Sequence, residues 1–167
     1  KLNLKQDYDT NGAWSATGVV NQSLLKSMLA DPYFALPPPK STGRDLFNAA
    51  WLTQHAIKDS KPEDVARTLV QLTSDSIIRA MQEYCPSVDE VYLCGGGAHN
   101  ELLRKSLESN LGNATLWTTD KLGVNVDWVE AAAFAWLAKQ TIENTPSNLP
   151  SATGADGLRV LGAIYPA

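Results

Sequence analysis

The chain has 167 residues, 44% of them hydrophobic and 19% charged, a composition typical of a soluble globular domain and not of a disordered tail, a fibre or a coiled coil. A formal net charge of −4 argues against a nucleic-acid partner bound by phosphate neutralisation. No stretch reaches the ~18 consecutive apolar residues that a membrane-spanning helix needs. The first residues lack a secretory signal, so we expect a cytoplasmic protein with Cys85 and Cys94 as free, buried thiols.

Turn-forming residues dominate the first 20 positions, which predicts irregular structure there. Asn21 is placed to cap a short helix, because apolar residues three and four apart share one face between positions 24 and 29. Asp31-Pro32 is expected to end that helix. Three prolines at 37–39 then predict an extended segment.

Further helices and strands follow in alternation. One helix is expected over residues 46–52, and a longer one begins at a capping box, Ser60–Glu63, with a broad apolar face suited to lying on a sheet. Short apolar runs predict strands at 90–94 and 114–117, and residues 159–164 are compatible with a last strand. This order predicts an α/β fold.

The glycine run at Gly95, Gly96 and Gly97 is the strongest local signal for chemistry. It follows a predicted strand, and a helix begins near Asn100. Glycines leave no side chains between the backbone and a ligand, and a helix start presents free N–H groups, as at the nucleotide-binding corners of open α/β sheets. Asn100 stands where a Rossmann fingerprint needs its last glycine, and no Walker A lysine follows. A tight turn without a ligand is the alternative.

A second helix start, at Asp127 and Glu130, carries paired carboxylates three residues apart. They form either a capping box or, through Glu130, a contact to substrate hydroxyls. The helix that follows is rich in alanine and apolar nearly all round, so we expect it to be buried on several sides. His99 follows the glycine run and could hydrogen-bond a ligand, but a histidine with no visible carboxylate or serine partner is more often a surface or packing residue.

Lys40 and Arg44 lie in a loop that superficially resembles the end of a phosphate loop. No strand leads into it and proline precedes it, so a solvated loop with a helix cap competes with a contact to an anion or a neighbouring subunit.

Six segments occur in order and span nearly the whole chain: PPKSTGRD at 38–45, GGGAHN at 95–100, Thr118-Thr119 with Gly123, Glu130-Ala131 with AFAWLA at 133–138, NLPSATGA at 148–155 and VLGAIYP at 160–166. In these segments the chain resembles the bacterial anhydro-N-acetylmuramic acid kinases of cell-wall recycling.

The resemblance implies a sugar kinase of the actin/hexokinase superfamily, with two ribonuclease-H-like domains around an ATP cleft. It implies that ATP, with Mg²⁺, and water convert 1,6-anhydro-N-acetylmuramic acid to N-acetylmuramate 6-phosphate. Residues 95–100 would form the adenosine-binding loop, with Gly95, Gly96, Gly97 and Asn100 as nucleotide contacts. The helix near 127–139 would be the second interdomain connecting helix, and Glu130 a sugar contact. A homodimer is also expected.

The resemblance further implies that parts of the catalytic site lie outside the chain. The family's Gly-Thr-Ser-x-Asp-Gly and Asp-Thr-Gly-Pro-Gly-Asn phosphate loops do not occur here. Its general-base aspartate is expected upstream of Lys1, since Asp7 and Asp9 stand in a different context. We therefore expect residues 1–167 to be a C-terminal portion that is inactive alone. The alternatives are a non-catalytic nucleotide-binding module, a dimerisation domain or an unrelated α/β binding protein.

Overall fold

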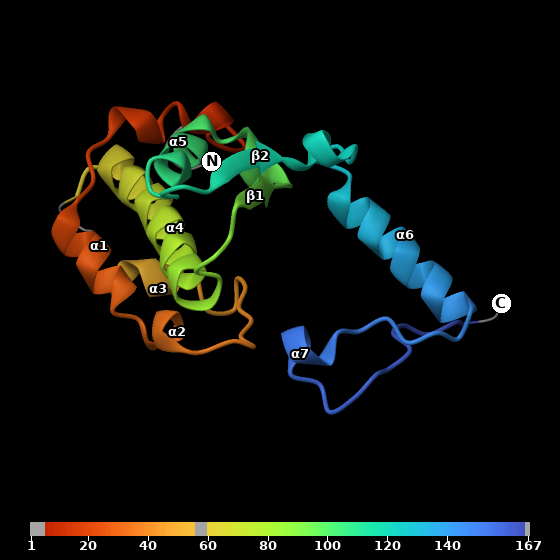
Figure 1. Ribbon diagram of the computed structural model, residues 1–167. Helices are drawn as coiled ribbons and strands as arrows, with labels where there is room; N and C mark the ends of the chain where they lie inside the picture. The colour runs from red at the N-terminus through yellow and green to blue at the C-terminus, as the bar shows by residue number, and fades with distance from the viewer. Residues whose placement is uncertain (1–5, 56–59, 166–167) are drawn as a thin grey trace.

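The computed structural model describes residues 6–55 and 60–165. Its elements in chain order are α1 (Gln22–Leu29), α2 (Pro32–Ala35), α3 (Ala49–Thr53), α4 (Pro62–Tyr84), β1 (Glu90–Leu93), α5 (Glu101–Glu108), β2 (Thr115–Thr118), α6 (Val129–Ile142) and α7 (Pro150–Thr153). Figure 1 shows α1 to α5 and the two strands gathered into one body, from which α6 extends. The predicted α/β character is confirmed.

The two strands form a parallel pair that positions the glycine run. Glu90 lies opposite Thr115 and Leu93 opposite Thr118, with α5 as the connection between the strands. Both predicted strands are therefore confirmed to within one residue. In a parallel pair the carboxyl ends lie at the same edge, so Gly95 and Thr119 both leave the sheet there.

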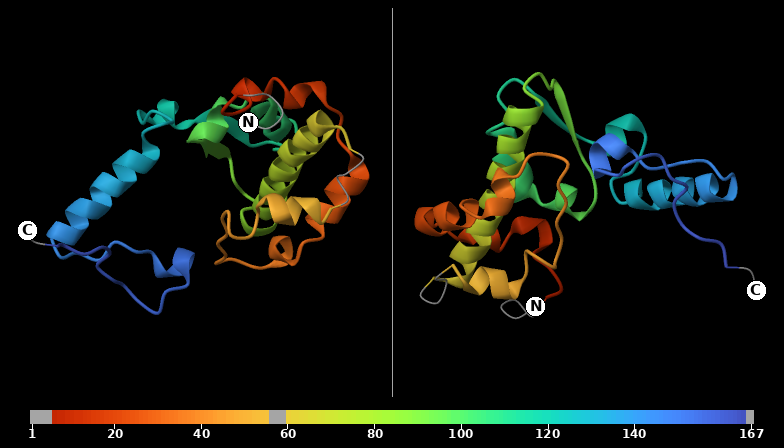
Figure 2. Two further views of the ribbon diagram at one scale, coloured as in Figure 1. Left: turned by 180° about the vertical axis from the view of Figure 1, so that it is seen from behind. Right: turned by 90° about the horizontal axis from the view of Figure 1, so that it is seen from below.

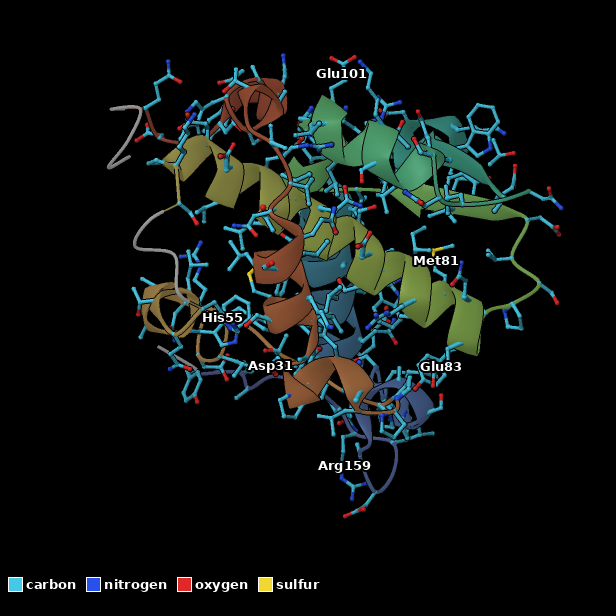
Figure 3. The ribbon with its side chains drawn as sticks, turned by 90° about the vertical axis from the view of Figure 1, so that its left-hand side faces the viewer. Asp31, His55, Met81, Glu83, Glu101 and Arg159 are labelled. Carbon is cyan, nitrogen blue, oxygen red and sulfur yellow. The ribbon has the colours of Figure 1, made fainter. Side chains whose placement is uncertain are left out.

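The hydrophobic core lies among helices. Helix α4 packs mainly against α5, α1 and the short 3-10 turn at Ser15–Thr17, where a sheet was expected. The buried apolar side chains of this core are Leu24, Leu25, Met28, Trp51, Val65 and Leu72. The indole Nε1 of Trp51 donates a hydrogen bond to Asp31 Oδ2 at 2.8 Å, so the polar part of this large side chain is satisfied. Figure 3 shows Asp31 and His55 together on this side of the molecule.

Helix starts follow the expected caps in part. Asn21 Oδ1 accepts from Leu24 N at 3.0 Å, which confirms the predicted cap of α1. The prediction of a capping box at Ser60–Glu63 is wrong, because the N-cap of α4 is Lys61, whose side chain makes no capping hydrogen bond. Asp64 instead accepts from Val19 N at 2.7 Å, a bond that ties the first turn of α4 to the N-terminal segment.

Of two further helix boundaries, the end of α1 before Asp31-Pro32 is confirmed and the start of α3 differs from expectation. Asp31 does follow the end of α1, but its carboxylate then caps α2 by accepting from Tyr33 N at 2.9 Å. The helix expected from position 46 begins at Ala49, because Asn48 caps it through Trp51 N. In both cases a short polar side chain selects the first helical residue.

Two expectations, the burial of the cysteines and a last strand, are wrong. Cys85 and Cys94 are free thiols, as predicted, but both are exposed. Residues 159–164 form no strand and lie after α7, where Leu161 O accepts a hydrogen bond from Thr141 Oγ1 in the last turn of α6. Pro166 of the last matching motif lies outside the described residues.

Helix α6 contains no buried residue, although burial on several sides was expected. Trp128 before it is 69% exposed and Phe134 within it 70% exposed. Both views in Figure 2 show α6 standing apart from the body. The segment after α6 returns toward the body, where Gly154 comes close to Pro39. The apolar side chains of α6 are therefore present as predicted, but the described residues leave them exposed.

Candidate functional site

The glycine run forms an open turn between β1 and α5. Gly95 has a φ of +69°, a left-handed conformation that favours glycine. A Cβ added at Gly95 or Gly96 would meet no atom within 4 Å, so the backbone faces open space at both positions. Gly95 N donates to Val126 O at 2.8 Å, which fixes the start of the turn. The packing of this turn therefore does not by itself require glycine at position 96.

A cavity of ≈ 680 Å³ opens beside this turn. The N-terminal wall consists of Tyr8, Asp9, Thr10 and Asn11. The opposite wall belongs to the glycine turn and consists of Gly96, Gly97, His99 and Asn100. Its volume lies within the range of about 300–1,000 Å³ typical of small-molecule sites. Three of the four predicted nucleotide contacts line it, and Gly95 precedes them directly. The geometry therefore favours a ligand loop over a turn without a ligand.

Asp9 holds the N-terminal wall in shape. Its carboxylate accepts hydrogen bonds from Trp14 N at 2.8 Å, from Ser15 N at 2.9 Å and from Ser15 Oγ at 2.7 Å. Desolvation by burial raises the pKa of Asp9, but these hydrogen bonds outweigh that effect and leave the pKa below its ordinary value of 3.8. The sequence predicted only turns in this segment, because the residues that Asp9 bonds lie five and six positions further along the chain.

Asn100 joins the two walls of the cavity. Its Oδ1 accepts from Leu103 N at 3.0 Å and so caps α5. The same oxygen would lie 2.3 Å from a Cβ at Gly12, so only glycine fits there. Asn100 is thus a structural residue of the cavity, and its predicted contact to a nucleotide stays a prediction.

His99 has a carboxylate partner that the sequence did not reveal. Its Nε2 lies 2.8 Å from Asp127 Oδ1, and the two side chains are 55% and 56% exposed. Asp127 therefore bonds a histidine of the glycine turn and does not cap α6, whose N-cap is Trp128 with no side-chain bond. The capping box predicted for Asp127 and Glu130 is wrong.

Glu130 lies in the first turn of α6 with an exposed side chain. Among the described residues its carboxylate takes part in no hydrogen bond or ion pair. It thus remains available to an external ligand, and its role as a sugar contact stays a prediction.

Lys40 has a structural role in the loop before α3. Its Nζ donates to two carbonyls of α2, Tyr33 O at 3.1 Å and Phe34 O at 3.3 Å. These bonds occupy the ammonium group, whereas the helix that follows the loop is capped by Asn48 and not by a residue of 40–44. Arg44 in the same loop is exposed.

Residues 6–55 and 60–165 contain no group of three or more His, Cys, Asp or Glu side chains arranged to hold a metal ion. Nor does any helix in this part of the chain combine the length and apolar character that crossing a bilayer requires.

Comparison with known proteins decides the family. The sequence model of the family described as anhydro-N-acetylmuramic acid kinase matches residues 1–167. The chain belongs to this family. A relative from Nitrosomonas europaea, named anhydro-N-acetylmuramic acid kinase, is 52% identical over 160 residues, or 96% of this chain. Relatives with the same name from Nitrosospira multiformis and Pseudomonas syringae pv. syringae are 51% and 49% identical over 162 and 166 residues.

These alignments cover only part of each relative. The second and third alignments cover 97% and 98% of this chain. The three alignments cover 44%, 44% and 46% of the length of the respective relative. This member of the anhydro-N-acetylmuramic acid kinase family thus spans less than half the length of the curated relatives that it matches.

Removing the Asp9 carboxylate should loosen the N-terminal wall of the cavity. We expect Asp9→Ala to lower the free energy of unfolding by about 1–2 kcal/mol at pH 7, since hydrogen bonds to a partly solvated charge are lost. Because the folded-state pKa is lowered, this stabilisation is full above 3.8 and is lost as the pH falls through the folded-state pKa.

Urea denaturation of the wild type and of Asp9→Ala between pH 2 and pH 7 would measure the difference in their free energies of unfolding. Asp89→Ala is the matched control, because Asp89 is exposed and its carboxylate makes no bond in the described part of the chain. An equal loss in both variants, or a difference that persists in acid, would contradict the role assigned to Asp9.

Proposed function

We propose that this chain is the C-terminal portion of an ATP-dependent, cytoplasmic kinase. The whole enzyme converts 1,6-anhydro-N-acetylmuramic acid and water to N-acetylmuramate 6-phosphate, with ADP as the other product. In this proposal the chain belongs to a protein of two ribonuclease-H-like domains. The observation that carries the proposal is the glycine-lined cavity, placed at the carboxyl edge of β1 in a chain whose full length matches the kinase family.

The cavity provides what binding of an adenosine moiety requires. Gly95 and Gly96 leave space into which a ligand can approach the main chain without meeting a side chain. The cavity lies at a strand-to-helix corner, where α/β proteins commonly bind nucleotides. We assign it to the nucleoside portion of ATP, with Gly95, Gly96, Gly97 and Asn100 as the contacts.

Glu130 is the residue that we assign to the sugar. A carboxylate accepts hydrogen bonds from sugar hydroxyls, and the Glu130 carboxylate has no competing partner in residues 6–55 and 60–165. Phosphoryl transfer also requires groups that hold the phosphates and activate the attacking water. We place those groups, with the general-base aspartate, in the part of the kinase that precedes Lys1. Mg²⁺ would enter with ATP, whose phosphates supply part of its ligands.

The glycine loop can be tested by adding a side chain where the fold has room. Gly96→Val should leave the melting temperature unchanged within about 2 °C, because a Cβ at this position meets nothing. It should weaken ADP binding at least tenfold, the effect of losing about 1.4 kcal/mol, with Gly96→Ala intermediate. Isothermal titration calorimetry gives the affinities. Unchanged ADP affinity in the folded valine variant would exclude the cavity as the nucleotide site.

Activity should require more than these 167 residues. The purified chain should bind ADP but show no phosphorylation of 1,6-anhydro-N-acetylmuramic acid, whereas the whole kinase that contains it should turn the sugar over. A coupled ADP-release assay with mass analysis of the sugar product compares the two. Turnover by the chain alone would refute the assignment of catalysis to another segment. ADP binding without turnover by the whole protein would favour a non-catalytic nucleotide-binding module.

The exposed apolar surface of α6 bears on the assembly. We propose that α6 is an interdomain helix covered by the other part of the kinase, and that the whole kinase is a homodimer. In sedimentation velocity, the isolated chain should self-associate more strongly than its Phe134→Glu variant, which places a charge on the 70% exposed apolar position. The whole kinase should remain a dimer with or without that substitution. Dissociation of the whole kinase by Phe134→Glu would instead identify α6 as the dimer interface.

A further inference from the structure

Two hydrogen bonds join the glycine turn to the segment that leads into α6. The backbone bond from Gly95 N to Val126 O holds the first glycine at 2.8 Å. The side-chain bond between His99 Nε2 and Asp127 Oδ1, also at 2.8 Å, holds the last residue of the turn. Both ends of the turn are therefore fastened to adjacent residues, Val126 and Asp127, just before the helix that carries Glu130.

This junction sets the position of the first turn of α6. Val126 is buried, with 6% of its surface exposed, whereas no residue of α6 itself is buried. Trp128, the N-cap, makes no side-chain cap bond that would fix the helix start. Asp127 precedes Glu130 by three residues, which is less than one helical turn. A displacement of His99 is thus transmitted to Glu130 through a short segment.

His99 also lines the cavity beside the glycine turn. Its bond to Asp127 is half-exposed to water, and water competes with such bonds and weakens them. A ligand in the cavity would displace water from the His99 ring and strengthen the bond, since hydrogen bonds are stronger where the local dielectric is low. Occupation of the cavity and formation of the bond therefore favour one another.

We propose that His99 and Asp127 are a positioning pair that couples occupation of the glycine-loop cavity by nucleotide to the placement of Glu130 for the sugar. The proposal rests on the proposed function, because it takes the nucleotide and sugar sites as assigned there. Neither side chain takes part in phosphoryl transfer. The coupling acts in both directions, so the sugar tightens nucleotide binding by the same factor as the nucleotide tightens sugar binding.

The test uses the whole kinase and measures the ADP dissociation constant with and without saturating 1,6-anhydro-N-acetylmuramic acid. The ratio of the two constants is the coupling, which we expect to be about fivefold or more in the wild type. His99→Ala and Asp127→Ala should each bring the ratio close to one, and the double variant should lower it no further. His99→Gln, whose amide nitrogen replaces Nε2, should restore part of the ratio.

Glu101→Gln is the matched control. Glu101 lies in the neighbouring helix α5, forms an ion pair with Lys105 at the surface, and points away from the body in Figure 3. Its substitution should leave the ratio unchanged. If an alanine variant fails to fold, the isosteric Asp127→Asn carries the test, because loss of the charge weakens the bond and should lower the ratio.

The results separate this proposal from the one on which it rests. A wild-type kinase that does not bind ADP would overturn the proposed function. A wild type that binds both ligands with a ratio near one would overturn only the coupling. Folded His99 and Asp127 variants that lose kcat but retain the wild-type ratio of ADP dissociation constants would also overturn the coupling. Such a loss is what a purely structural bond would produce.

Discussion

The candidate site depends on the close approach of Gly12 to Asn100. The backbone of Gly12 occupies a place where even a Cβ would lie 2.3 Å from Asn100 Oδ1 and 3.0 Å from Leu102 Cβ. That same amide oxygen caps α5. One side chain thus determines where the helix begins and how near the N-terminal turn can come. The wall that Asp9 stabilises, the glycine turn and the start of α5 consequently behave as one packed unit around the cavity.

Several parts of the fold could be predicted from local sequence. The Asn21 cap of α1, the proline in the first turn of α4 and the strand–glycine–helix corner all depend on residues within a few positions of one another. The cavity itself could not be predicted. Its N-terminal wall lies more than 80 residues before the glycine run in the sequence, and only the folded chain shows that Gly12 and Asn100 meet.

The wrong expectation about Asp127 has a physical cause. A carboxylate or hydroxyl before a helix can cap it, but it can also bond a tertiary partner when one is available. Asp127 bonds His99, 28 residues earlier, and the first turn of α4 is tied to Val19, 45 residues before Asp64. Spacing within a helix start identifies polar groups of the right type. The choice between a cap and a distant partner is made by tertiary structure.

The chain therefore consists of a packed body and a helical arm with different sources of stability. The body has its own core, whereas α6 is connected to it before Glu130 by Val126 and two hydrogen bonds. Two hydrogen bonds contribute about 1–3 kcal/mol together, and burying one exposed side chain such as Phe134 contributes about 1.5–3 kcal/mol. A surface that covers several exposed apolar side chains of α6, such as Phe134 and Trp136, would outweigh the junction in setting its resting orientation. The junction would then determine how α6 responds when the cavity fills, which separates stability of the assembly from communication between its sites.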